Sequence, residues 1–273
     1  MTRPSKVPLP NPLGTALVTG ASSGIGEALA HCFAAAGLDL VIVARSKLKL
    51  EALAKQLAAQ HGIAVSVVLA DLAQPDAAHS IHHQLTRQKC PVTVLVNCAG
   101  VLEQGLFTSI GAASHQQIID LNISGLTAMI HAFLPDMVAR GHGRVLNVAS
   151  VAAFQPVPSL ASYAASKAYV LSLSESLAEE LRGTGVTVTT LCPGITATAM
   201  LSQAAGANGK LGQLPRFLVG DAEQVARQGF NACMRGEAIC VPGMVNQAAM
   251  VASRATPKWL VRRLGGLLGR KAI

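Results

Sequence analysis

A chain of 273 residues with 51% hydrophobic residues can bury a large core, which excludes a mainly disordered protein and favours one α/β domain over two small ones. The formal net charge is +8, but six basic residues and no acidic one fall within 254–273, and aromatic residues make up only 3% of the chain. With so few aromatic side chains to stack on bases, and no basic run in the body of the chain, we expect no nucleic-acid partner.

Neither the N-terminal segment nor the cysteines point to secretion. Residues 1–13 hold four prolines and no long apolar run, which predicts an extended Pro-rich arm and not a signal peptide. The longest uncharged run, Val145–Ser166, contains prolines and several serines and is therefore a poor membrane span. The six cysteines lack C-x-x-C or Cys/His spacing, so we expect reduced thiols, no metal site and a cytoplasmic protein.

Strand-like and helix-like segments alternate along residues 14–243, which predicts one α/β domain with a doubly wound parallel sheet covered by helices on both faces. The seven expected strands are Thr15–Thr19, Asp39–Ala44, Ala64–Ala70, Val92–Asn97, Arg144–Ser150, Val186–Cys192 and Ala238–Val241. The expected helices are Ile25–Ala36, Lys47–His61, Pro75–Lys89, Ala112–Arg140, Ser162–Gly183 and Asp221–Arg235.

The turn after the first strand, T-G-A-S-S-G-I-G at 19–26, has the context of a dinucleotide-binding turn, although its spacing is not that of ordinary Rossmann dehydrogenases. Gly20 permits a tight turn, Gly24 lets the backbone approach a pyrophosphate, and Gly26 lets helix and strand pack closely. The N-terminus of the following helix offers free N–H groups to the anion.

The end of the second strand faces the adenosine ribose in this fold, and it carries Arg45 where an acidic residue would favour NAD. A guanidinium suits a 2′-phosphate, which Ser22, Ser23 and Ser46 can also bind, so we expect NADP, with NAD the weaker alternative. Arg45 as a solvated surface cation is the other interpretation. Asp71 fits either an acceptor for the adenine amino group or a helix N-cap.

Polar residues also follow the fourth strand, where the winding reverses and the ligand crevice is expected. Asn97 and Gly100 lie at its carboxyl end, and Gly100 leaves room for the cofactor, whereas Cys98 is expected to be a packed thiol. Asn122 lies on a long apolar helix, where its amide either satisfies the structure or holds a water near the site.

The stretch Asn147–Lys167 is the candidate centre of the chemistry. Tyr163 and Lys167 are four residues apart and share one helical face. An ammonium beside a phenol favours the phenolate, so we expect the pKa of Tyr163 to fall toward neutrality. Ser150, at a strand end, can place its hydroxyl near the same point.

The sixth strand leads into P-G-I-T-A-T, where Pro193 and Gly194 turn the chain and Thr196 and Thr198 can bind a carboxamide. Residues 200–219, rich in Gly, Ala and Leu, fit a mobile lid over an apolar substrate or a plain loop.

Together these motifs, in this order and spacing, resemble the short-chain dehydrogenase/reductase family over roughly residues 13–242. The resemblance implies that Tyr163 is the general acid/base, that Lys167 lowers its pKa, that Ser150 polarises the substrate carbonyl and that Asn122 binds a water of the proton relay. It also implies a Rossmann fold whose turns at the carboxyl ends of the strands hold NADP. The implied cofactor residues are Gly20, Ser22, Ser23, Gly24, Ile25, Gly26, Arg45, Ser46, Asp71, Leu72, Asn97, Ala99, Gly100, Tyr163, Lys167, Pro193, Gly194, Thr196 and Thr198.

The C-terminal segment 244–273 lies outside the resemblance. After Pro257 it places leucines on one helical face and basic residues elsewhere. Such a helix packs on its own domain or a partner subunit, or it rests as a peripheral contact on anionic lipid.

We therefore expect an NADPH-dependent oxidoreductase that interconverts a small apolar carbonyl and a secondary alcohol, assembled as a homodimer or homotetramer. The alternative is a catalytically idle NADP-binding sensor or docking protein, against which the complete Ser, Tyr and Lys set argues.

Overall fold

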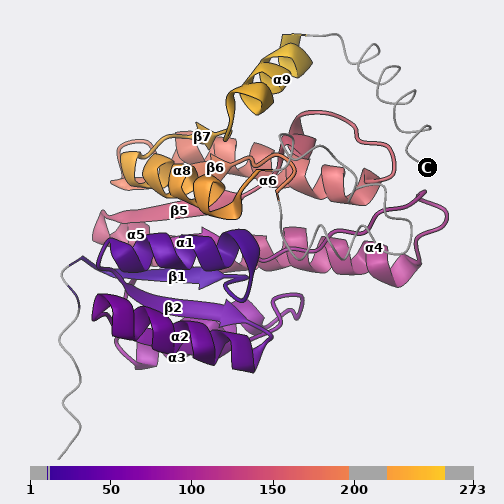
Figure 1. The fold of residues 1–273 in the computed structure, drawn as a ribbon. Coiled ribbons are helices and arrows are strands. Elements are labelled where there is room, and N and C mark those ends of the chain that lie inside the picture. Colours follow the sequence, from indigo (N-terminus) through magenta and orange to yellow (C-terminus); the bar gives the residue numbers. More distant parts are fainter. Residues whose placement is uncertain (1–10, 12, 197–219, 256–273) are drawn as a thin grey trace, which may run out of the picture.

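The computed structural model describes residues 11, 13–196 and 220–255 (Figure 1), and within them seven strands form one sheet in the order β3-β2-β1-β4-β5-β6-β7. The strands are β1 (Thr15–Thr19), β2 (Asp39–Ala44), β3 (Val65–Leu69), β4 (Val92–Asn97), β5 (Gly143–Val148), β6 (Val186–Leu191) and β7 (Ile239–Cys240). All neighbouring strands are parallel. The predicted doubly wound parallel sheet is confirmed, and its winding reverses between β1 and β4.

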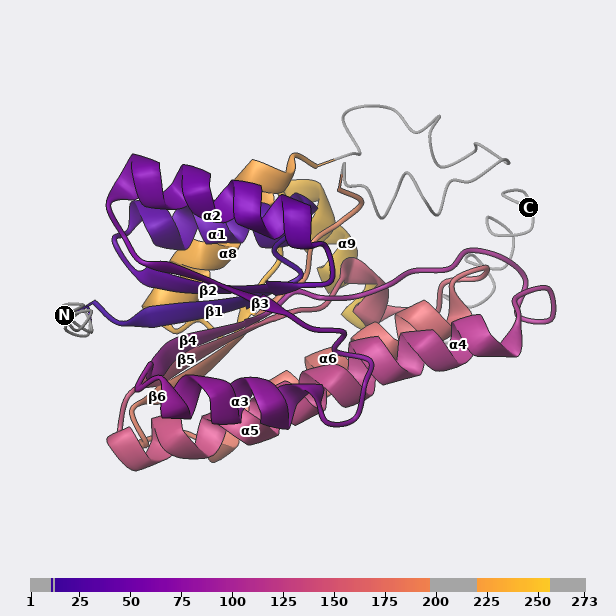
Figure 2. The same cartoon turned by 90° about the horizontal axis from the view of Figure 1, so that it is seen from below.

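Helices cover both faces of this sheet, as the continuous apolar runs of its strands require. Figure 2 shows α1 (Gly24–Ala35), α2 (Lys47–His61) and α8 (Ala222–Arg235) on one face, and α3 (Ala77–Arg87), α5 (Leu126–Arg140) and α6 (Ala161–Glu180) on the other. Each layer has its own core: Phe33 and Leu50 are fully buried on the first face, and Met129 and Met137 on the second.

The expected helix Ala112–Arg140 is not one regular α-helix. It consists of α4 (Ala112–Ile119), a π-helix η1 (Asp120–Gly125) and α5. The whole stretch is apolar and long enough to cross a membrane by composition, but 44% of its most apolar window is buried inside the protein. Packing against the sheet therefore accounts for the apolar character of its inward side.

Two further elements were not predicted. Residues Val151–Phe154 form a short 3-10 helix, η2, directly after Ser150, and Met244–Ala255 form a helix, α9, after the last strand. Other ends differ from the predictions by one to three residues, because hydrogen-bonded pairing and not composition decides where an element stops.

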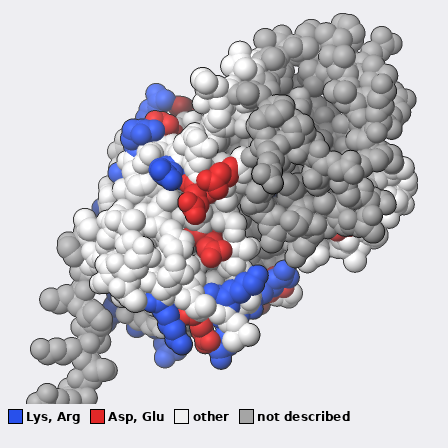
Figure 3. All heavy atoms as spheres, in the orientation of Figure 1, with Lys and Arg blue, Asp and Glu red and all other residues white. Residues whose placement is uncertain are grey.

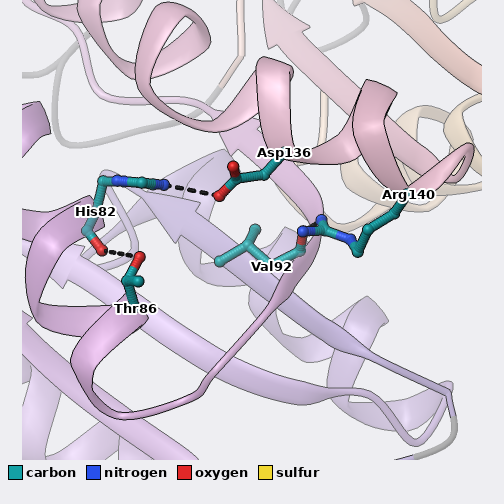
Figure 4. Close-up of polar contacts among 5 residues, drawn as sticks. All are labelled: His82, Thr86, Val92, Asp136 and Arg140. Atoms are coloured by element: carbon teal, nitrogen blue, oxygen red, sulfur yellow. Dashed lines mark hydrogen bonds and ion pairs between the residues drawn. The ribbon is translucent and has the colours of Figure 1, made fainter.

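On the second face, polar contacts connect α3, α5 and β4 (Figure 4). His82 Nε2 lies 2.8 Å from Asp136 Oδ2, and Arg140 Nη2 donates to the Val92 carbonyl over 2.8 Å. The His82 ring also packs edge-on against Phe133. These contacts join α3 to α5, and α5 to the amino end of β4. They lie away from the carboxyl ends of the strands, which carry the candidate site.

Several predictions lie outside the described residues: the arm at 1–10, Thr198, the lid at 200–219 and the helix after Pro257. Figure 3 shows acidic and basic side chains side by side among the described residues of the face in view. No patch of a single sign of charge covers that part of the surface.

Candidate active site

The candidate site lies at the carboxyl ends of β1, β4 and β5, where the direction of winding changes. In an open parallel sheet this reversal leaves a crevice outside the strand ends. The turns after these three strands carry most of the residues that the sequence singled out.

The backbone conformation and packing of the first turn require its glycines. Gly20 has φ +67° and Gly24 φ +60°, both in the left-handed region that favours glycine. A β-carbon on Gly20 would lie 2.9 Å from the Ala99 backbone, and one on Gly26 would overlap the Gly20 carbonyl oxygen. The tight turn at Gly20 and the close packing at Gly26 agree with their predicted roles.

Thr19 ties the turns after β1 and β4 together and was missed by sequence reasoning. Its hydroxyl donates to the Val96 carbonyl over 3.1 Å and accepts from the backbone N–H groups of Cys98 (2.9 Å) and Ala99 (3.1 Å). A threonine at the end of a strand carries no signal for such a contact, because its partners are nearly 80 residues away in the chain.

The N-terminus of α1 has the features of an anion site. Its N-cap residue Ser23 is extended and makes no side-chain capping bond, and Ser22, Ser23 and Ile25 are partly exposed. The N–H groups of the first helical turn point toward the helix N-terminus and favour negative charge there. A pyrophosphate fits this position.

The predicted adenosine-side residues lie at the ends of β2 and β3. Arg45 is exposed and forms no ion pair within the described part of the chain, and Ser46 is the N-cap of α2 without a side-chain capping bond. Asp71 accepts from the Ala73 N–H over 3.2 Å in a local turn, while Asp76 precedes α3, so Asp71 is not a helix N-cap. Leu72 is buried beside them.

Lys167 is the buried cation of the site. Its side chain is 6% exposed, and Nζ donates to the Val148 carbonyl over 2.9 Å and lies 5.7 Å from the centre of the Tyr163 ring. Burial lowers the pKa of Lys167 from its ordinary 10.5 to about 8. The buried ammonium has donor capacity left beyond Val148, which suits the hydroxyls of a ribose.

The expectation that the pKa of Tyr163 falls toward neutrality is wrong for this structure. Although the side chain is partly exposed, burial of the phenol raises its pKa, and a hydrogen bond with the Ser150 side chain offsets only part of the rise. The phenolate is disfavoured because leaving water penalises an anion more than these neighbours stabilise it. Ser150 and Tyr163 are nevertheless in contact, as the sequence predicted.

Asn122 is satisfied by the protein. It lies in η1, is buried, and its Oδ1 accepts from Val101 N–H over 2.9 Å, while Nδ2 donates to Val101 O (3.0 Å) and Ser166 Oγ (3.1 Å). Of the two alternatives for this amide, the structure supports the structural one. It also places Asn122 close to the centre, since a β-carbon on Gly100 would lie 3.2 Å from Asn122 Oδ1 and 3.6 Å from Lys167 Nζ. These two side chains therefore lie beside the space that Gly100 leaves.

Asn97 and Cys98 pack into the protein. Asn97 Nδ2 donates to Asn147 Oδ1 over 2.9 Å, and Asn147 Nδ2 donates to Ser174 Oγ over 2.9 Å, a buried chain that joins β4, β5 and α6. Burial raises the pKa of Cys98 to about 12, which agrees with a packed thiol.

The segment after β6 borders Ser150. Pro193 O accepts from Val151 N–H over 2.9 Å, and Thr196 Oγ1 donates to Gly194 O over 3.0 Å. Thr196 is buried and its hydroxyl is used within the turn. The turn that begins at Pro193 therefore lies next to the start of η2, which follows Ser150 directly.

Comparison with known proteins decides the family. A family model described as short chain dehydrogenase matches residues 14–208. The chain belongs to the short-chain dehydrogenase family. It is 37% identical over 182 residues to a short chain dehydrogenase of Pseudocercospora fijiensis, a match that covers 66% of this chain and 59% of that protein. It is 33% identical over 187 residues to the inactive hydroxysteroid dehydrogenase-like protein 1 of Homo sapiens, covering 68% of this chain and 56% of that one.

Among solved structures, this short-chain dehydrogenase is similar to one from Sphingobium yanoikuyae in complex with NADPH, with a TM-score of 0.78 and 32% identity over 88% of this chain and 93% of that one. The predicted fold and family are thus confirmed. The site geometry adds that Gly100, Asn122, Ser150, Tyr163 and Lys167 converge on one place, although they come from four different parts of the chain.

Proposed function

We propose that this short-chain dehydrogenase is an NADPH-dependent oxidoreductase that interconverts a carbonyl and a secondary alcohol, with Tyr163 as general acid/base. The observation that carries the proposal is the convergence of Ser150, Tyr163 and Lys167: Ser150 is close enough to lower the pKa of the Tyr163 phenol, and the Lys167 ammonium lies 5.7 Å from the centre of the phenol ring. Two hydroxyl donors that meet beside a buried cation suit a carbonyl oxygen that gains negative charge.

NADP as the cofactor is supported by three independent features. The uncapped N-terminus of α1 is ready for a pyrophosphate, Arg45 is exposed and free for a 2′-phosphate, and the similar Sphingobium yanoikuyae structure holds NADPH. When bound, NADPH would supply the hydride.

The chain's own residues then supply the proton. In the reducing direction the hydride adds to the carbonyl carbon, and the Tyr163 hydroxyl gives its proton to the carbonyl oxygen, so that one alcohol forms. The Ser150 hydroxyl donates a hydrogen bond to the same oxygen. A tyrosine phenol ordinarily holds its proton at neutral pH, and burial raises the pKa of Tyr163 further, so the group is present as the acid. Oxidation of an alcohol reverses both transfers.

The loop that follows β4 supports an apolar substrate. The loop after β4 is joined to the loop before α6 by a hydrogen bond from Gly105 N–H to Ser159 O (3.0 Å), and it presents Leu106 and Phe107, 50% and 62% exposed. Exposed apolar side chains on a loop that is bonded to the segment just before α6, the helix that carries Tyr163, fit a small or medium apolar ketone or aldehyde. The homodimer or homotetramer, the cytoplasmic location and a membrane contact of the C-terminal segment stay predictions.

The test is NADPH oxidation with a panel of carbonyl compounds. We expect wild type to turn over, and Tyr163→Phe to lose roughly 10²- to 10⁴-fold in kcat because it keeps the ring but lacks the proton. NADPH affinity, followed by cofactor fluorescence, should stay within a few-fold in this variant. A Tyr163→Phe protein that turns over like wild type would contradict the role of Tyr163.

A second candidate is a catalytically idle NADP-binding protein, favoured by one observation: the human relative is named as inactive. Tight NADPH binding without turnover in both directions across the panel would support this candidate. The complete and closely placed Ser150, Tyr163 and Lys167 set argues against it, since an idle protein has no chemical need for all three.

A further inference from the structure

The backbone on either side of Ser150 is joined to the segment that leaves β6. Ala149 N–H donates to Leu191 O over 2.7 Å, and Val151 N–H donates to Pro193 O over 2.9 Å. The start of η2 and the turn that begins at Pro193 therefore move as one unit. A side chain that packs against either segment therefore restrains the position of both.

Helix α9 contacts this unit from outside the residues that the family model matches. It packs against η2, and Met250 joins the same hydrophobic cluster as Val151 and Phe154. The start of α9 also places Asn246 directly on Gly194. A β-carbon on Gly194 would lie 2.6 Å from Asn246 Nδ2, 2.7 Å from Oδ1 and 2.9 Å from Cγ.

This contact explains the glycine at 194. Its φ lies outside the left-handed region, so the backbone does not demand glycine, and the three nearest atoms to an added β-carbon all belong to Asn246. The absence of a side chain is needed because the Asn246 amide occupies the space.

Asn246 is not free to swing away. Its Nδ2 donates to the Pro242 carbonyl over 2.7 Å, and the next residue, Gln247, donates through Nε2 to the Val241 carbonyl over 3.0 Å. Both bonds fasten the start of α9 to the chain that leaves β7. The amide is thus held against Gly194 by a hydrogen bond that would have to break for the side chain to move away.

We propose that Asn246 is a positioning residue: through its contact with Gly194, α9 holds the turn after β6, and with it η2, in the arrangement that binds the cofactor beside Ser150. The inference rests on the proposed function, because it assigns the turn at Gly194 to cofactor binding. Helix α9, which lies outside the residues that the family model matches, would then help to form the cofactor site.

The test is a pair of variants and their combination, with NADPH as the probe. Gly194→Ala should raise the Kd for NADPH roughly tenfold, because the added methyl meets a fixed amide and displaces the turn. Gly194→Ala combined with Asn246→Ala should bring the Kd back to that of Asn246→Ala alone, clearly below the Kd of Gly194→Ala, since the obstacle is gone. A Gly194→Ala protein that binds like wild type, or a double variant that binds no better than Gly194→Ala, would overturn the proposal.

Gln247→Ala is the matched control, because it removes an amide-to-carbonyl bond of the same helix start without touching Gly194. It should lower Tm but keep the Kd within about twofold, whereas Asn246→Ala alone should raise the Kd about threefold. Equal Kd values for these two variants would also overturn the proposal. If wild type binds NADPH but reduces no carbonyl, the oxidoreductase function fails while the Kd values still decide the role of Asn246; if wild type does not bind NADPH, both fail.

Discussion

Replacing Lys167 by Met tests the central electrostatic argument, because the buried ammonium leaves a signature in the pH dependence of stability. Burial lowers the pKa of Lys167 from 10.5 to about 8, so between these values the unfolded chain binds a proton that the folded chain has released. Stability therefore rises with pH in this window. For these two pKa values wild type gains about 1.3 kcal/mol of unfolding free energy between pH 7 and pH 9, and a variant without the amine does not.

The assay is urea unfolding of wild type and Lys167→Met at pH 7, 8 and 9, with the difference between the two proteins plotted against pH. Burial raises the pKa of the Cys98 and Cys192 thiols to about 12, so both stay neutral in the folded protein up to pH 9, and their titration in the unfolded chain is common to both proteins. Lys47→Met is the matched control, because the Lys47 side chain is 66% exposed and its ammonium stays in water in both states. A Lys167→Met difference that is flat, or that shrinks as pH rises, would refute the burial of a perturbed ammonium here.

Two further substitutions examine the cofactor turns. Arg45→Asp should weaken NADPH binding roughly tenfold or more and shift preference toward NADH, since a charge-assisted bond to a 2′-phosphate is replaced by repulsion; unchanged Kd values for both cofactors would show that Arg45 does not contact the phosphate. Gly26→Ala should destabilise the fold by about 1–3 kcal/mol, because its β-carbon would overlap the Gly20 carbonyl oxygen. Gly111→Ala, whose β-carbon meets nothing within 4 Å, should change Tm little, and an equal loss in both glycine variants would contradict the overlap.

The sheet and its order could be predicted from the sequence because both follow from local patterns. Buried parallel strands are short apolar runs, and the spacing of Gly20, Gly24 and Gly26 indicates the turn that starts a doubly wound sheet. The pairing of Tyr163 with Lys167 follows from helical geometry alone. These predictions needed no knowledge of distant contacts.

The rest depended on contacts between remote residues. Asn122 accepts a hydrogen bond from Val101, 21 positions away, and it lies in a π-helix that the local sequence does not predict. The partners of Thr19 are 77 to 80 positions away, and the contact between Asn246 and Gly194 joins segments that have no shared motif. Sequence spacing indicates which residues share a face, but it does not show what lies opposite that face.

The pKa of Tyr163 shows why a motif alone gives the wrong sign. Helical spacing brings an ammonium near the phenol, and in water that would favour the phenolate. The same packing that brings them together removes both from water, which raises the pKa of the phenol and lowers that of the ammonium, so burial moves each group toward its neutral form. A neutral phenol is the state that donates a proton, whereas oxidation of an alcohol needs the phenolate as base. We therefore expect a pH profile in which reduction of the carbonyl proceeds at neutral pH and oxidation of the alcohol rises only at higher pH, and identical pH profiles for the two directions would contradict this role of Tyr163.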